Sequence, residues 1–216
     1  MADNPQTEVE VKNDTGAPVP VSVIGATSTT PIGNVGDRLK VDSQSTAVTI
    51  VGLEKTYSAS VLGLNVAANP TDVLLVKGSS TKKIKISSII FSGIQTNSSV
   101  IDIVLIRRTA DNTGGTRASL TNVNRDSSDA AATAQVFSYT VNPSALGASI
   151  GIVRAVAALL PNKNSAGATS VGLFEFNDGT LKPIILNNAN EYLSLNLNGV
   201  SVPGSSLNIC VEWTEE

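Results

Sequence analysis

The stretch at residues 191–216, EYLSLNLNGVSVPGSSLNICVEWTEE, decides the fold class of this 216-residue chain. Apolar residues occupy every second position in both halves of the stretch, namely Leu193, Leu195 and Leu197, and then Leu207, Ile209, Val211 and Trp213. A period of two is typical of a β-strand with one buried face. Because a loop around Pro203 and Gly204 separates the halves, we predict an antiparallel strand pair whose apolar faces meet one core. Cys210 falls on the opposite face.

The same period of two continues over most of the chain from Tyr57 onward. The strands predicted upstream and within the closing stretch are 57–66, 72–77, 82–94, 99–108, 133–141, 149–160, 171–176, 183–187, 191–197 and 206–213. Gly, Pro, Asn and Ser residues separate them. We therefore predict an all-β fold, an antiparallel β-sandwich of the jelly-roll type, for residues 53–216.

Three segments need separate treatment. The pattern of 149–160 fits a strand or a helix, and Gly151 with the β-branched residues favours a strand. Residues 99–108 are apolar on both faces over most of their length, which predicts a central strand that is covered on both sides. A short helix is predicted near 127–133, where Ser127 or Ser128 precedes an alanine run as a cap.

Residues 1–52 differ from the rest of the chain. They contain four prolines, and the first aromatic residue of the chain is Tyr57. Short alternating pieces occur at 9–11 and 19–23, but proline cannot donate a hydrogen bond to a sheet, which excludes a central strand. We predict an extended N-terminal arm that becomes ordered against a neighbouring subunit, because an extended segment can add to an exposed sheet edge. A disordered tail is the alternative.

The composition excludes several kinds of active site. The chain has no histidine and a single cysteine, so it lacks a Ser-His-Asp triad, a histidine metal site and an intrachain disulfide. Charged residues make up 15% of the chain, against about 25% in an average domain. We predict no catalytic residues, no cofactor-binding residues and no metal ligands.

Partners of two classes are also not expected. The chain has 15 basic and 18 acidic residues without a basic cluster, which disfavours nucleic acid because phosphate contacts need grouped Lys and Arg. No apolar run approaches the roughly 18 residues of a membrane span, so no membrane contact is expected. The polar N-terminus, MADNPQTEVEVKND, predicts no signal peptide.

Two acidic loops have plainer interpretations than metal binding. The loop at 111–116, DNTGGT, is oxygen-rich but has one carboxylate, so we interpret it as a hairpin turn with Gly114 and Gly115 at positive φ. Asp126 and Asp129 bracket two serines, which is typical of helix capping or a solvated loop.

Other candidate groups also have plain explanations. Glu175 and Asp178 form a possible carboxylate pair of the glycosidase kind, but Glu175 lies opposite the face of Phe174 and Phe176, and Asp178 belongs to an Asn-Asp-Gly turn. Lys82, Lys83 and Lys85 indicate a solvated strand face or an interface with acidic groups. Cys210 is expected to behave as a small buried hydrophobe. These interpretations favour a structural or interaction protein and not an enzyme.

Three stretches resemble proteins of tailed-bacteriophage virions. The opening VEVKNDTGAPVPVS at 9–22 resembles N-terminal segments of such virion proteins that lead into β-rich modules. The region 77–155, with KGSSTKKIKISSIIFSGIQT, IDIVLIRRTADNTGGT and YTVNPSALGASIGIVRA, resembles phage structural proteins. The ending at 191–216 resembles the closing strands of jelly-roll capsid-decoration and fibre-like proteins.

The resemblance implies a β-sandwich that assembles on a capsid or tail as a symmetric oligomer, and it carries over no functional residue. The function expected is that of a cement protein, which decorates and stabilises the phage capsid by bridging neighbouring subunits, as a homotrimer. The expected partner is the major capsid protein or another virion protein. The expected location is the capsid surface of the virion, after synthesis in the host bacterial cytoplasm.

Two alternatives remain at the level of the sequence. A tail, baseplate or head-fibre component that binds a host-surface glycan would need an exposed aromatic platform, and Trp213 lies on the predicted core face. A polysaccharide depolymerase would need a groove lined by carboxylates such as Asp102, Glu175 and Glu191, whose spacing shows no such arrangement.

Overall fold

The computed structural model describes residues 11–12, 18–19, 54–164, 172–176 and 182–216. The chain divides into two units, Met1–Thr49 and Ile50–Glu216. In the first unit, β1 (Val11–Lys12) pairs antiparallel with β2 (Pro18–Val19), with Val11 opposite Val19. The remainder of the predicted arm at 1–52 lies outside the described residues, so its extended form stays a prediction.

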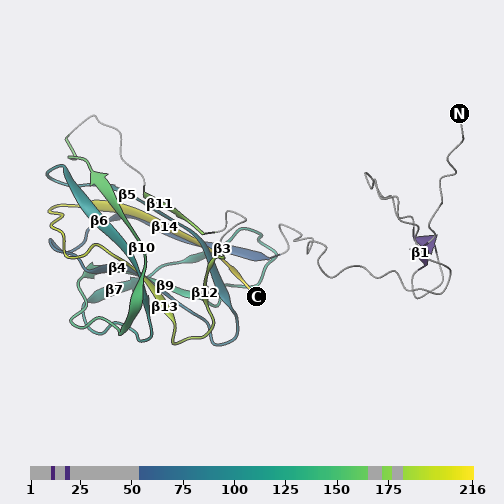
Figure 1. The fold of residues 1–216 in the computed structure, drawn as a ribbon. Helices are drawn as coiled ribbons and strands as arrows, with labels where there is room; N and C mark the ends of the chain where they lie inside the picture. Colours follow the sequence, from purple (N-terminus) through teal and green to yellow (C-terminus); the bar gives the residue numbers. More distant parts are fainter. Residues whose placement is uncertain (1–10, 13–17, 20–53, 165–171, 177–181) are drawn as a thin grey trace, which may run out of the picture. The chain divides into compact units, whose positions relative to one another are not determined.

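The second unit has no helix among its described residues and consists of two antiparallel sheets of six strands each. Figure 1 shows the strands of both sheets. The sheet that we call the β13 sheet has the order β10-β6-β13-β4-β9-β7. Its strands are β4 (Asp72–Lys77), β6 (Ser99–Arg108), β7 (Thr116–Ser119), β9 (Gln135–Val141), β10 (Ser149–Leu160) and β13 (Tyr192–Asn196).

The second sheet, the β14 sheet, has the order β11-β5-β14-β3-β8, and β12 also pairs with β5. Its strands are β3 (Lys55–Leu64), β5 (Ile84–Ile94), β8 (Asn122–Asn124), β11 (Gly172–Glu175), β12 (Ile184–Leu186) and β14 (Ser206–Glu215). We call the face of each sheet that points away from the other sheet its outer face.

The core lies between the two sheets. Leu193 and Leu195 of β13 meet Ile209, Val211 and Trp213 of β14 in one cluster of buried side chains. Each fully buried aliphatic or aromatic side chain of this kind contributes about 1.5–3 kcal/mol relative to exposure. The predicted antiparallel β-sandwich is confirmed, whereas the narrower jelly-roll topology stays a prediction.

The predicted pairing of the last two strands is wrong. β13 lies between β4 and β6, and β14 lies between β3 and β5, so the two strands belong to different sheets. Their apolar faces do meet one core, but across the sandwich. The period of two is the same for two strands that pair side by side and for two that face each other, so the alternation does not distinguish these arrangements.

The segment 149–160 forms the strand β10, as predicted. The predicted helix at 127–133 is wrong, because side chains of the sandwich satisfy the backbone there. Glu215 accepts hydrogen bonds from the backbone N–H groups of Thr133 and Ala134, at 2.9 and 3.0 Å. The Tyr57 hydroxyl donates to the carbonyl of Ala130, at 3.0 Å. These bonds hold residues 130–134 without helical structure, after a turn at 127–128.

Two short strands, β7 and β8, were not expected from the sequence. They are four and three residues long, and every residue of β7 is exposed. Without a buried face they lack the apolar alternation that identifies the other strands.

Strand β6 is interior to its sheet, but the prediction that both of its faces are covered is wrong for the outer face. On the inner face Ile101, Ile103 and Leu105 are buried. On the outer face Val104 is buried, but Val100 remains 62% exposed. The apolar residues of this face therefore have no complete cover among the described residues.

We expect the substitution Glu215→Ala to lower the free energy of unfolding by about 3 kcal/mol, because buried donors left without an acceptor cost about 1–3 kcal/mol each. Besides the two backbone donors, the Glu215 carboxylate accepts from Trp213 Nε1 at 3.0 Å and from the Thr133 hydroxyl at 2.7 Å. Urea denaturation followed by the fluorescence of the single tryptophan measures the change.

The matched control is Glu175→Ala, which removes an exposed carboxylate from β11 and should change stability by no more than about 0.5 kcal/mol. Equal effects of the two substitutions would contradict the anchoring role of Glu215.

Candidate functional site

The most concentrated group of buried polar residues lies on the outer face of the β13 sheet. A β-bulge in β4 places it there: Leu74 pairs with Leu195, but the next pair is Asp72 with Asn196, so Val73 is the extra residue. Val73 joins the core, and Asp72 turns to the outer face. Asp72 is fully buried, and Arg108 from the end of β6 is 3% exposed.

Asp72 and Arg108 form a bidentate ion pair. Arg108 Nε donates to Asp72 Oδ2 and Nη2 donates to Oδ1, both at 2.8 Å. The Nδ2 atoms of Asn112 and Asn196 donate to the same two oxygens, at 2.9 and 2.6 Å. Each carboxylate oxygen thus accepts two hydrogen bonds, which uses the acceptor capacity of the group.

Arg108 makes further contacts besides those to Asp72. Its Nη1 donates to the carbonyl of Gly147 at 2.7 Å, and its Nε also contacts Ser194 Oγ at 3.1 Å. Asn112 completes the arrangement by accepting from the Gly147 N–H at 2.8 Å. The pair therefore connects two loops to the sheet, and the acceptor capacity of its carboxylate is used within the protein.

The loop at 111–116 is one of these two loops. Gly114 and Gly115 have φ of 68° and 73°, as predicted. The hairpin interpretation is wrong, because the loop joins β6 to β7, which lie far apart in the sheet order. Thr113 instead pairs with Ala145 of the second loop, and Asp111 accepts from Arg117 at 2.8 Å. The loop is thus a cover on the sheet and not a cation site.

The acidic residues near 126–129 bind the chain itself. Asp126 Oδ1 accepts from the backbone N–H and the hydroxyl of Ser128, at 2.9 and 2.7 Å. These hydrogen bonds lower the pKa of Asp126. No helix follows, so the cap that the sequence suggested is a local turn.

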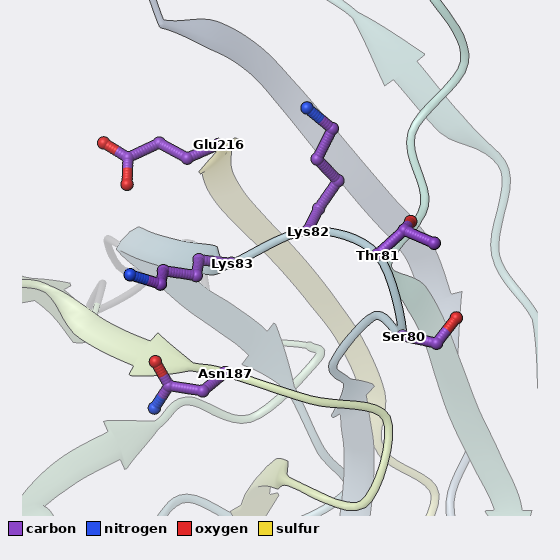
Figure 2. A pocket seen from close by; sticks show the side chains of 6 residues that line it. All are labelled: Ser80, Thr81, Lys82, Lys83, Asn187 and Glu216. Atoms are coloured by element: carbon purple, nitrogen blue, oxygen red, sulfur yellow. The ribbon is translucent and has the colours of Figure 1, made fainter.

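The predicted lysine cluster separates into two parts. Lys85 pairs with Glu54, at 2.6 Å, and with Glu216. Lys82 and Lys83 instead line an open depression of about 450 Å³ together with Ser80, Thr81, Asn187 and Glu216. Figure 2 shows the two lysine side chains extending in different directions, so they do not converge on one ligand.

Of the possible carboxylate pair and the cysteine, the structure describes Glu175 and Cys210. Glu175 is exposed, and Phe174 and Phe176 are buried on the other face, as predicted. Asp178 lies outside the described residues. Cys210 is half-buried on the outer face of the β14 sheet, where it pairs with Ser60 and Ile90.

Asp102 and Glu191 do not share a groove with Glu175. Asp102 is exposed on β6 and accepts from Asn198 Nδ2 at 3.4 Å, whereas Glu191 binds Arg107 at 2.5 Å. Within the described ranges, no three His, Cys, Asp or Glu side chains gather as metal ligands. No helix in the part of the chain described here is long and apolar enough to cross a membrane.

The eight aromatic side chains of the chain all lie among the described residues. Seven of them are buried, and Phe137 is half-buried with the guanidinium of Arg117 stacked 4.2 Å from its ring centre. No ring is therefore available as an exposed platform on which a sugar could stack.

The feature that remains is an exposed apolar surface along β10, which we call the β10 face. It consists of Val100, Leu146, Ile150, Ile152, Val153 and Leu159. Ile150 and Ile152 are 63% and 66% exposed. Val100 lies opposite Leu159 in the pairing of β6 with β10, and Leu146 lies in the loop that leads into β10. Contiguous exposed apolar surface of this kind marks interaction sites on soluble proteins.

In comparisons with known proteins, no family model, no curated protein and no solved structure matches the chain.

Sequence reasoning missed the Asp72–Arg108 pair and the β10 face. Two signals were available. Asp72 directly precedes the apolar run of TDVLLVK, and Arg108 follows the apolar run of IDIVLIRR. A charged residue at the end of such a run lies close to the core. The pairing itself depends on the bulge at Val73, which the alternation of residues does not reveal.

We expect Asp72→Ala to destabilise the protein by about 3–5 kcal/mol, because it leaves Arg108 buried without a counter-charge. The exposed Asp102→Ala on β6, the strand that carries Arg108, is the control and should cost no more than about 0.5 kcal/mol. Urea denaturation of both variants measures the difference. A loss below about 1 kcal/mol for Asp72→Ala would exclude the locking role of the pair.

The Lys85 cluster predicts a small dependence of stability on pH. The hydrogen bonds from Lys85 and Thr214 lower the pKa of Glu54 below its ordinary value of 4.5. Because the pKa is lower in the folded state, the stabilisation is complete above the ordinary pKa and is lost as the pH falls through the folded pKa.

We expect Lys85→Met to reduce stability by less than about 1 kcal/mol near pH 6.5, since the pair is partly exposed. The deficit should shrink between pH 6.5 and pH 3, as the pH falls toward and through the lowered pKa of Glu54 and protonation removes the ion pair. Urea denaturation at the two pH values tests this, and a deficit that stays constant or grows at low pH would be inconsistent with the ion pair.

Proposed function

We propose that the chain is a non-enzymatic structural protein of a phage virion, a cement protein that stabilises the capsid by bridging neighbouring capsid subunits. The proposal rests on the sequence resemblance described above and on one structural observation. The β10 face is an exposed apolar surface on a sandwich whose most concentrated buried polar group, around Asp72 and Arg108, is engaged within the protein. A protein with this distribution acts through contact between surfaces and not through bond chemistry.

The N-terminal arm at 1–52 is assigned the bridging role in this proposal. An extended segment of about 40 residues reaches at most about 130 Å, at about 3.3 Å per residue, which is enough to cross a neighbouring subunit. The sandwich would cover a joint between capsid subunits, and the arms would extend to adjacent ones. A trimer is the stoichiometry that we propose for one joint.

The glycan-binding alternative receives no support from the surface. A sugar that binds by stacking needs an accessible aromatic ring. Seven of the eight aromatic rings of this chain are buried, and the eighth, Phe137, is stacked against Arg117. We therefore do not extend the proposal to a tail, baseplate or head-fibre receptor.

Deletion of residues 1–52 should leave a folded sandwich and abolish stable association with the particle. Virions made without the native gene product are complemented with the full chain or with the deletion variant, and quantitative mass spectrometry of purified particles gives the copy number. We expect the deletion variant to be lost from particles, and the particles to break at a lower temperature.

A variant with residues 1–52 replaced by a Gly/Ser linker of equal length is the matched control, since it keeps the reach of the arm and removes its side chains. Occupancy unchanged by the deletion would contradict the role of the arm. Particles that resist heating equally well with and without the protein would contradict the cement function itself.

A further inference from the structure

The point where the N-terminal arm joins the sandwich is fixed by a group of charged side chains. Glu54, close to the end of the arm at 1–52, accepts from Lys85 Nζ and from Thr214 Oγ1, both at 2.6 Å. Lys85 also pairs with Glu216, which lines the open depression of about 450 Å³ described above. The arm therefore joins the sandwich beside this depression.

The two lysines that line the depression have no counter-charge. Lys82 and Lys83 are exposed, and neither forms a salt bridge among the described residues, whereas six other basic side chains of the sandwich do. The Glu216 carboxylate is bound by Lys85 instead. The ammonium groups of Lys82 and Lys83 are therefore available to carboxylates from outside the sandwich.

The backbone that carries these lysines is held at both ends. The Lys83 N–H donates to the carbonyl of Glu216, and the Glu216 N–H donates to the carbonyl of Lys83, both at 3.1 Å. On the other side of the loop, the hydroxyl of the buried Ser79 accepts from the Thr81 N–H at 3.1 Å. A ligand would therefore bind a loop that is already ordered, which lowers the entropy cost of binding.

The directions of the two lysines indicate the form of the ligand. In Figure 2 the side chains of Lys82 and Lys83 point away from each other, so they suit two separate carboxylates better than one small anion. In an extended chain, residues two apart lie on the same side of the backbone, about 6.5–7 Å from each other. An acidic segment with a carboxylate at every second residue has the matching chemistry.

The sequence contains such a segment at its beginning. Residues 54–216 contain 12 acidic and 12 basic residues, whereas residues 1–53 contain six acidic and three basic residues. Residues 1–10, which lie outside the described residues, contain Asp3, Glu8 and Glu10 but no lysine or arginine. Glu8 and Glu10 have the spacing of two that the pair of lysines requires.

We propose that the depression at Lys82 and Lys83 binds residues 1–10 of a second copy of this chain, with Glu8 and Glu10 paired to the two lysines. This inference rests on the bridging role proposed above for the arm, and it names the surface on which the arm ends. Each arm starts beside its own depression and ends in that of the next copy. Head-to-tail contacts of this kind can close into a ring, of which the proposed trimer is an example.

The contact is weak unless the copies are already held together. Exposed ion pairs contribute little each, and salt screens them. Within an oligomer the arm is tethered, and its effective concentration at a neighbouring site reaches the millimolar range. A free segment should therefore bind with a dissociation constant on the order of 1–10 mM, and tethering should raise the occupancy of the site.

Titration with the free segment tests the site. The full chain with Glu8→Gln/Glu10→Gln, labelled with ¹⁵N, has an arm that does not compete, and the probe is the synthetic peptide MADNPQTEVE. We expect the amide signals of residues 80–83 to shift. The dissociation constant should rise at least about threefold from about 0.05 M to about 0.3 M salt, because the pairs are exposed.

Two controls accompany the titration. The same peptide with Glu8→Gln/Glu10→Gln should cause no shift at residues 80–83. Adding Lys82→Gln/Lys83→Gln to the labelled chain should abolish the shifts, whereas Lys163→Gln/Lys182→Gln, which removes two exposed lysines elsewhere, should preserve them.

Disulfide trapping distinguishes a second copy from the same chain. The variants Cys210→Ser/Val9→Cys and Cys210→Ser/Thr81→Cys are mixed and mildly oxidised, and mass spectrometry identifies the linked peptides. We expect a disulfide between positions 9 and 81 of two chains, and its loss when Lys82→Glu/Lys83→Glu is added to the second variant. The matched control for position 81 is Cys210→Ser/Ala118→Cys, on the exposed strand β7.

Three results would overturn the inference. These are unchanged signals at residues 80–83, equal shifts with the glutamine form of the peptide, and equal cross-linking of position 9 to positions 81 and 118. A disulfide that forms only when both cysteines are in one chain would also overturn it. Because these measurements use the purified protein, they are separate from the occupancy and heat resistance of particles, which test the cement function.

Discussion

The structure depends on the burial of one apolar face from each of two sheets against the other. Strands β13 and β14 lie at the middle of their sheets, and their alternating side chains fill the space between them. This contact buries one face of each strand. The character of the two outer faces of the sandwich depends on the residues at the alternate positions. The differences between those outer faces account for most of what is particular to this protein.

The outer face of the β14 sheet is mixed, because Ile90 and Val123 expose apolar side chains beside its polar residues. Ser60 and Asn208 are exposed there, and Cys210 is half-buried beside them. The outer face of the β13 sheet is covered at one end by two loops, which the buried Asp72–Arg108 pair fastens to the sheet. A buried ion pair of this kind is tolerated because it is bidentate and because both carboxylate oxygens accept a further hydrogen bond, from Asn112 and Asn196. The cover ends before β10, and the apolar residues beyond it remain exposed.

This distribution explains why the candidate catalytic groups of the sequence have structural roles. Asp111 holds Arg117, and Asp126 holds Ser128. Glu215, which the sequence did not single out, anchors the segment that was expected to be helical. Carboxylates that already accept several internal hydrogen bonds stabilise the fold, and they have little capacity left to bind or activate another molecule. The apolar side chains of the β10 face, in contrast, stay exposed.

The alternation of residues was sufficient to locate most strands, because a strand with one buried face shows its period locally. The segments 72–77, 99–108 and 149–160 were predicted with the same bounds that the structure has. The errors came from properties that are not local. The separation of β13 from β14 depends on which strands lie between them, and the coil at 127–133 depends on a carboxylate about 80 residues away along the chain.

By itself, the sequence determined the fold class, the positions of the main strands, the core face of Trp213 and the lack of a histidine-based site, because composition and periodicity are properties of the chain alone. Only the tertiary structure decided which strands are neighbours, which charges are buried together and which apolar residues stay uncovered. Those outcomes depend on long-range pairing, and a bulge of one residue at Val73 is enough to reverse the face on which Asp72 lies.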